Sequence, residues 1–267
     1  MAAVQPRSAV IIKPEDAAAA QELGVSLLEG LLLAASERPA LPIRAHSDRL
    51  SSGARGLSLT ALRAIRTFFG RHGGLSKLMD KVCKEEGFDA SVCKLTASTG
   101  LSLAESMVHA AAQAGADVTR LVGDATSFFS YSWTGTKLED MLASIERKVE
   151  ALEMADGTPR YVWVDMFAAS QNLLAGSFLP LAQAERDSLK ASDPAGYAAR
   201  KEATDTIFDD AISAVGTSGP REIFLYLSPL TGEWLAPLHQ FLLPGRGEPP
   251  ANWLRKGPGA ITRAWCW

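Results

Sequence analysis

The residues best suited to bind a ligand follow three short apolar segments in the C-terminal half of the chain. They are Ser130, Tyr131, Ser132, Trp133, Asp165, Phe167, Gln171 and Ser228. Together they would offer a nucleotide hydroxyl donors, aromatic surface for stacking and a carboxylate for a ribose hydroxyl. In an open parallel sheet, ligands bind beyond the carboxyl ends of the strands. We therefore expect these side chains to meet at one edge of a sheet.

Each of these residues also has a purely structural interpretation. Trp133 could pack its own loop, Asp165 could cap a turn, and the serines could hydrogen-bond to nearby backbone. The residue types alone leave both interpretations open.

Other kinds of catalytic or phosphate-binding site find little support. The sequence has no GxxxxGK[ST] motif and no GxGxxG motif that opens a helix after a strand, which argues against kinase, GTPase and Rossmann dehydrogenase functions. Ser130 lacks the Gly-x-Ser-x-Gly elbow that a triad with His239 and Asp165 would need. Cys83 and Cys93 are too far apart for a CxxC pair, so no metal site is expected and catalytic residues stay unassigned.

The elements that must position these residues alternate between strand and helix. Strands are predicted at 126–131, 160–167 and 223–228, because these segments are short and rich in apolar, β-forming residues. Helices are predicted after Thr136, with Glu139 completing a capping box, and at 201–215. A long segment at 170–200 is predicted to be a loop that is partly helical. This alternation predicts an α/β fold with a doubly wound parallel sheet.

The first 120 residues have a different character. Apolar spacing predicts helices at 15–37, 58–71, 75–87 and 102–115, with a capping box between Ser102 and Glu105. Residues 38–56 are rich in Pro, Ser, Gly and Arg and read as a linker. We therefore divide the chain into a helical region at 1–120 and an α/β domain at 121–267.

Several segments of the second half resemble TIR domains. The segments are Phe128-Phe129-Ser130-Tyr131-Ser132-Trp133, Phe224-Leu225-Tyr226-Leu227-Ser228 and Arg263-Ala264-Trp265-Cys266. Asp165-Met166-Phe167 followed by Gln171 resembles a variant of the same fold in uncharacterised microbial and algal proteins. The resemblance covers about 121–267, and the order and spacing of the segments carry it more than any one motif does.

The resemblance implies a three-layer, flavodoxin-like or TIR-like parallel sheet. It also implies a self-associating module of intracellular signalling or defence that binds NAD or another nucleotide. TIR domains that hydrolyse NAD carry a glutamate a few residues after the Trp-Cys pair, whereas this sequence stops one residue after Cys266. We therefore expect a C-terminally truncated sheet and no NAD cleavage. The alternatives are a structural interaction domain without a small-molecule site, or an NAD glycohydrolase whose glutamate lies beyond Trp267.

Charge and hydropathy limit the kinds of partner and the cellular location that we expect for this protein. The net charge is −3, with net +2 over residues 1–120 and net −5 over 121–267, so nucleic acid is not the expected partner. Residues 38–81 have a local net charge of +7, and Arg63 and Arg66 lie on one polar helix side that could face an anionic partner or only solvent. The apolar stretch Leu27–Ala35 is too short for a membrane span, and no signal peptide is evident, so we expect a cytoplasmic protein.

Overall fold

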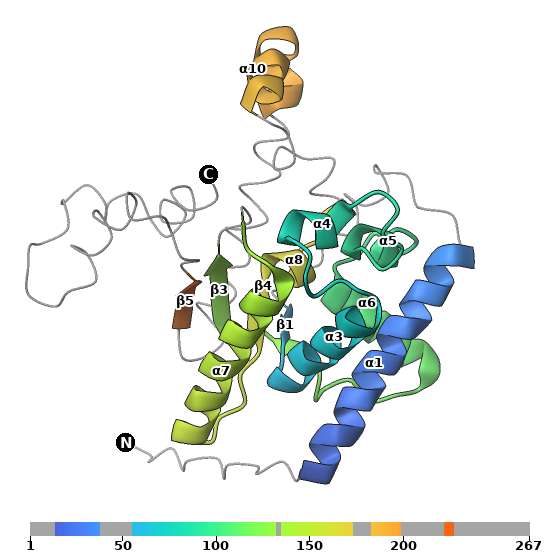
Figure 1. Ribbon diagram of the computed structural model, residues 1–267, viewed down its shortest axis with the longest axis vertical. Helices are drawn as coiled ribbons and strands as arrows, with labels where there is room; N and C mark the ends of the chain where they lie inside the picture. The colour runs from blue at the N-terminus through green and yellow to red at the C-terminus, as the bar shows by residue number, and fades with distance from the viewer. Residues whose placement is uncertain (1–13, 38–54, 132–134, 173–182, 199–221, 227–267) are drawn as a thin grey trace, which may run out of the picture.

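The computed structural model describes residues 14–37, 55–131, 135–172, 183–198 and 222–226 (Figure 1). Its elements, in chain order, are α1 (Pro14–Glu37), β1 (Arg55–Leu57), α3 (Leu59–Arg71), α4 (Met79–Lys84), α5 (Val92–Thr96), α6 (Leu103–Ala114), β2 (Val122–Asp124), β3 (Ser127–Tyr131), α7 (Leu138–Asp156), β4 (Val162–Val164), α8 (Asp165–Ala168), α10 (Gln183–Ser192) and β5 (Glu222–Tyr226). The helices predicted at 15–37, 58–71 and 102–115 are confirmed. The helix predicted at 201–215 lies outside the described residues.

One sheet has the strand order β2-β1-β4-β3-β5. β3 is parallel to both of its neighbours, β4 and β5, and Figure 1 shows it between them. The three strands predicted from sequence are therefore adjacent and point the same way. The strand predicted at 160–167 is shorter than expected, because β4 is only Val162–Val164 and the helix α8 begins at Asp165. β1, however, is antiparallel to both β4 and β2. The α/β class is thus confirmed, and the expectation of an all-parallel sheet is wrong because β1 enters the sheet in the opposite direction.

β1 comes from a segment expected to be a linker, which corrects the prediction for residues 55 and 56. After this strand, the Ser58 hydroxyl accepts a hydrogen bond from the backbone N–H of Ala61 at 3.1 Å and caps α3. The backbone N–H of Ser58 donates to the carbonyl of Leu121 at 2.9 Å. Residues on either side of position 120 are therefore joined through one sheet and one hydrophobic core.

The two predicted capping boxes have different outcomes. At α6, the Ser102 hydroxyl accepts from the Glu105 backbone and the Glu105 carboxylate accepts from the Ser102 backbone, as expected. At α7, the expected box between Thr136 and Glu139 does not form. The Glu139 backbone N–H donates instead to the carbonyl of Leu75 at 3.1 Å. This pairing between 75–78 and 136–139 also explains why the helix predicted at 75–87 is only Met79–Lys84.

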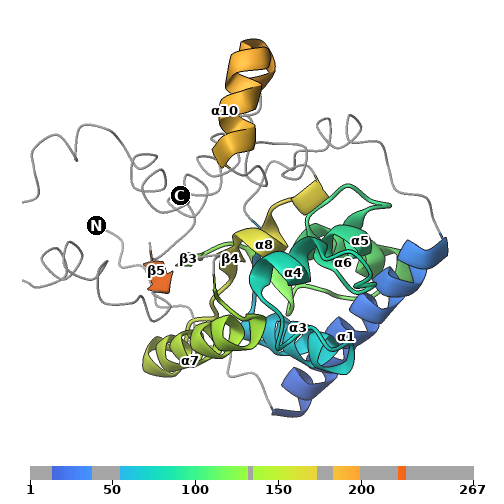
Figure 2. The same cartoon turned by 45° about the horizontal axis from the view of Figure 1, so that its top comes forward.

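The helices form most of the core around the sheet. α1 packs against α3, α5 and α6, and α3 also packs against α7 (Figures 1 and 2). Along β3 the side chains alternate, as strand geometry requires. Phe129 and Tyr131 join the main core, whereas Phe128 stacks on Trp163 with ring centroids 4.8 Å apart. In both views α10 stands apart from this body.

One helix among the described residues is long and apolar enough to cross a membrane. It is Glu15–Glu37, within α1, with a mean hydropathy of 1.3. Leu28 and Leu31 of this helix lie in the core beside α3 residues. Length and composition are weak evidence for a span in a helix that is packed in this way.

Candidate functional site

The carboxyl ends of three parallel strands lie at one edge of the sheet. The parallel register pairs Ser127 with Val162 of β4 and with Glu222 of β5, so the three strands leave the sheet in the same direction. Tyr131 is the last residue of β3, and Asp165 follows the last residue of β4. This edge is where an open α/β sheet binds its ligands.

Tyr131 and Asp165 meet at this edge, although 34 positions separate them in the printed sequence. Burial raises the pKa of the Tyr131 phenol well above its ordinary value, and the negative charge of the nearby Asp165 carboxylate raises it further. The Oδ1 atom of Asp165 also accepts from the backbone N–H of Met166 at 2.6 Å. Asp165 is therefore the first residue of the short helix α8 and lies close to the end of the neighbouring strand.

Gln171 is buried beside them and holds the backbone that follows β4. Its amide nitrogen donates to the carbonyl of Asp165 at 2.7 Å and to that of Ala169 at 3.3 Å. Its amide oxygen accepts from the Cys83 thiol at 3.3 Å. Gln171 thus holds the turn after β4 through its amide nitrogen and contacts α4 through its amide oxygen.

The remaining predicted ligand-binding residues are placed differently. Phe167 is fully buried in the main hydrophobic core. The backbone of Ser130 pairs with Leu225 in the sheet. The structure does not describe the side chain of Ser130, nor the residues Ser132, Trp133 and Ser228. The structure therefore brings together Tyr131, Asp165 and Gln171 as a buried polar cluster at the carboxyl ends of β3 and β4.

Two cysteines that sequence reasoning set aside belong to this cluster. Cys83 is in the last turn of α4 and Cys93 in the first turn of α5, and their Sγ atoms are 3.8 Å apart. Cys83 is buried, and Cys93 is partly exposed. A ten-residue separation gives no sequence signal for such a contact, because the turn between the two short helices creates it.

The two thiols have opposite electrostatic tendencies. The hydrogen bond between them lowers the pKa of Cys93, burial opposes this, and the positive charge of Lys84 lowers it further. The same hydrogen bond and burial raise the pKa of Cys83. Cys93 is therefore the thiol that ionises first.

Within the described part of the chain, no group of three or more His, Cys, Asp or Glu side chains could hold a metal ion. Cys83 and Cys93 lack a third donor of this kind, and the amide of Gln171 is engaged in hydrogen bonds. The chemistry of this cluster is that of thiols, a phenol and a carboxylate.

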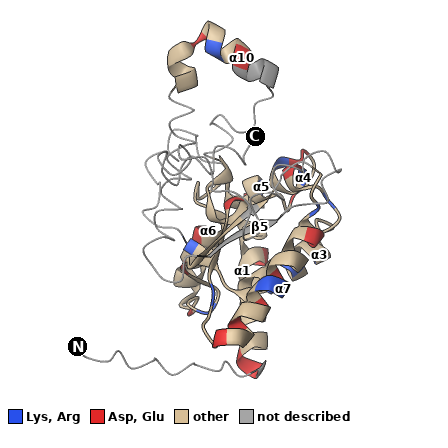
Figure 3. Ribbon diagram, turned by 90° about the vertical axis from the view of Figure 1, so that its left-hand side faces the viewer, with Lys and Arg blue, Asp and Glu red and all other residues tan. Residues whose placement is uncertain are grey.

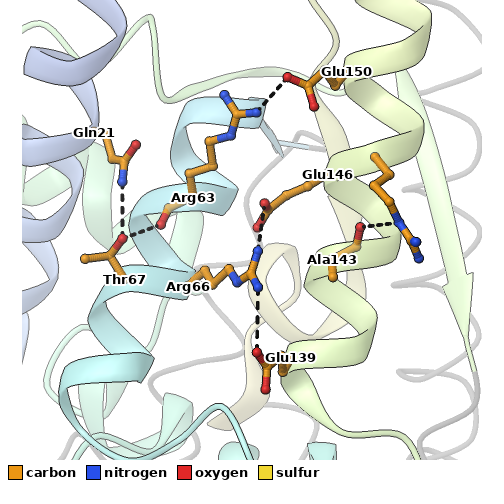
Figure 4. Close-up of polar contacts among 9 residues, drawn as sticks. Gln21, Arg63, Arg66, Thr67, Glu139, Ala143, Glu146 and Glu150 are labelled. Carbon is orange, nitrogen blue, oxygen red and sulfur yellow. Dashed lines mark hydrogen bonds and ion pairs between the residues drawn. The ribbon is translucent and has the colours of Figure 1, made fainter.

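Arg63 and Arg66 of α3 are paired with acidic residues of α7 (Figure 4). Arg63 contacts Glu150 at 2.9 Å, and Arg66 lies between Glu146 at 3.3 Å and Glu139 at 3.6 Å. The charged residues of α3 are all arginines, whereas α7 carries charges of both signs (Figure 3). Arg63 and Arg66 therefore join two helices instead of forming a single-sign surface for an anionic partner.

A scan of protein-family models found no match to this chain, and searches of curated proteins and of solved structures found none either.

Proposed function

We propose that this protein is a TIR-like module of cytoplasmic signalling or defence that binds NAD or a related nucleotide and associates with copies of itself. The binding site lies beyond the carboxyl ends of β3 and β5. The order of the three parallel strands is the observation that carries the proposal.

The chain runs β3, then β4, then β5, yet β3 lies between the other two. After β4 the chain therefore crosses to the opposite side of β3. In flavodoxin-like sheets this reversal marks the switch point, and ligands bind in the crevice between the first and third strands. Here that crevice corresponds to the ends of β3 and β5, at Tyr131 and Tyr226.

The residues that follow these two strand ends in the sequence supply suitable binding chemistry. Ser132 and Trp133 come directly after β3, and Ser228 comes two residues after β5. In the proposed site, Trp133 stacks on a base and the serines bond to hydroxyl or phosphate oxygens. The buried position of Asp165 close to Tyr131 supports the proposal because it places polar groups together where β3 and β4 end.

Isothermal titration calorimetry, which measures the heat of binding, tests this proposal when NAD, ADP-ribose or ATP is added to the full chain. We expect saturable binding of at least one of them. Trp133→Ala should weaken it about five-fold or more, because stacking on an aromatic ring contributes about 1–3 kcal/mol per base. Met154→Ala is the matched control, because Met154 is 82% exposed near the far end of α7 and should leave binding unchanged.

Chromatography of the NAD mixture separates the alternatives. The proposal predicts intact NAD after incubation. Release of nicotinamide would instead support the glycohydrolase interpretation. Failure to bind all three ligands would reject the proposed site and favour a structural interaction domain. Light scattering across a concentration series tests self-association separately, and a mass that stays monomeric would reject that part.

A further inference from the structure

The contact between Cys83 and Cys93 has no role in the proposed nucleotide site. The two sulfur atoms, 3.8 Å apart, are neighbours but not bonded, since a disulfide requires about 2.05 Å. α4 and α5, which carry them, pack against each other. The turn between the helices includes Gly87, whose φ of +81° is a conformation that glycine adopts without strain. Bonding therefore requires the two side chains to approach, with the helices already adjacent.

The surroundings give the two sulfur atoms different roles. Cys93 is partly exposed, so it is the thiol that a reagent from solution can reach, and the positive charge of Lys84 favours its ionisation. Cys83 is only 4% exposed, and its thiol contacts both Cys93 and Gln171. A partly exposed attacking sulfur with a buried partner in contact is the arrangement needed for two-step disulfide exchange.

We propose that Cys83 and Cys93 form a reversible intramolecular disulfide by exchange with a low-molecular-weight disulfide. First, the Cys93 thiolate attacks the reagent disulfide. A bond forms between Cys93 Sγ and one reagent sulfur, and the other sulfur leaves as a thiolate. Cys83 then loses its proton to solvent and attacks Cys93 Sγ, which releases the second reagent thiolate. Two protein thiols are oxidised and one small disulfide is reduced.

The disulfide also changes the turn after β4. While both thiols are protonated, the Cys83 thiol donates to the amide oxygen of Gln171, and the amide nitrogen of Gln171 holds the carbonyls of Asp165 and Ala169. A disulfide sulfur has no hydrogen to donate. Oxidation therefore removes one restraint on Gln171 and loosens the backbone beside Tyr131. This link does not depend on nucleotide binding.

Glutathione disulfide is the probe for the experiment. The full chain carrying Cys266→Ser, alongside the unsubstituted chain, is incubated with it and then alkylated and mapped by mass spectrometry. We expect a cross-linked peptide containing Cys83 and Cys93, a loss of two hydrogens from the intact mass, and reversal by a dithiol reductant. If the folded chain shows no such cross-link, or only bonds between chains, the proposal is wrong.

Two single variants test the assigned roles. Cys83→Ser should accumulate glutathione on Cys93, because the resolving thiol is missing. Cys93→Ser should react at least ten-fold more slowly, because the buried thiol alone is protected. Glutathione attached mainly to Cys83 would overturn this order. Hydrogen exchange over residues 165–172 should rise on oxidation of the unsubstituted chain, and unchanged exchange there would reject the link to the turn after β4.

Discussion

At the scale of single residues, Glu146 is the clearest case of a charge held inside the fold. Its side chain is 11% exposed, and one carboxylate oxygen accepts from Arg66 at 3.3 Å. The other oxygen has no hydrogen-bond partner among the described residues. Burial raises the pKa of Glu146 above its ordinary value of 4.5, and the charges of Arg66 and Arg63 only partly offset this effect. The ion pair therefore positions α7 against α3 without making the ionised carboxylate favourable.

We predict that Glu146→Gln becomes more stabilising as pH rises. Below pH 4.5 the carboxyl is protonated in both the folded and the unfolded chain. As pH rises toward the raised folded pKa, the unfolded chain loses its proton first, so the free energy of unfolding falls. Glutamine carries no such penalty. The melting temperature of the variant minus that of the native chain should increase between pH 4 and pH 7.

Glu150→Gln is the control for that measurement, because Glu150 is half-exposed and pairs with Arg63 at the surface. Surface pairs of this kind contribute about 0–1 kcal/mol. A difference for Glu146→Gln that stays constant or decreases with pH would contradict the assigned burial penalty.

At the scale of secondary structure, two glycines allow β1 and β2 to approach Tyr161. A Cβ atom at Gly56 would lie 2.6 Å from the backbone carbon of Tyr161, and one at Gly123 would lie 2.8 Å from the ring. The hydroxyl of Tyr161 then donates to the carbonyl of Thr119 at 2.8 Å. This close approach lets a three-residue antiparallel strand join the sheet beside β4.

Gly56→Ala should lower the free energy of unfolding by about 1–3 kcal/mol, because the added methyl group meets backbone that cannot rotate away. Gly30→Ala provides the opposite control. It lies within α1 with nothing within 4 Å of its Cβ position, so alanine should stabilise the helix by about 0.5–1 kcal/mol. Urea denaturation of both variants gives the two values. Equal, small effects would argue against the tight packing of β1 on Tyr161.

At the scale of the whole molecule, one hydrophobic cluster extends from α1 to α8. It contains Leu28 of α1, Leu57 of β1, Ile145 of α7 and Val164 of β4, all fully buried. The helical first half and the strands of the second half therefore bury their apolar side chains against each other. We expect them to unfold together.

Leu28→Ala and Ile145→Ala should each lower the free energy of unfolding by about 2–5 kcal/mol, the usual cost of emptying a buried leucine or isoleucine site. Differential scanning calorimetry should show each change shifting the same transition. Leu33→Ala is the control on the same helix as Leu28, since Leu33 is 61% exposed and should change little. Two transitions that respond separately to the two core variants would contradict a shared core.

Some features of this protein follow from local sequence. The capping box of Ser102 with Glu105 spans four residues, and the three apolar segments that became β3, β4 and β5 were recognisable from composition. The meeting of Tyr131 with Asp165 followed from placing those segments in parallel. In each case, residues close in sequence, or a general rule for parallel strands, contain the needed information.

Tertiary structure alone decided the features that depend on distant partners. The antiparallel strand β1 packs closely on Tyr161, which is distant from it in sequence. The capping box expected between Thr136 and Glu139 does not form, because the Glu139 N–H donates to Leu75. The contact of Cys83 with Cys93 depends on the packing of α4 on α5. From sequence, Arg63 and Arg66 were expected on a polar helix side that faces an anionic partner or solvent. In the structure they form ion pairs with carboxylates of α7. A short segment specifies its own backbone preference, but its partners are selected by the burial and hydrogen bonding of the entire chain.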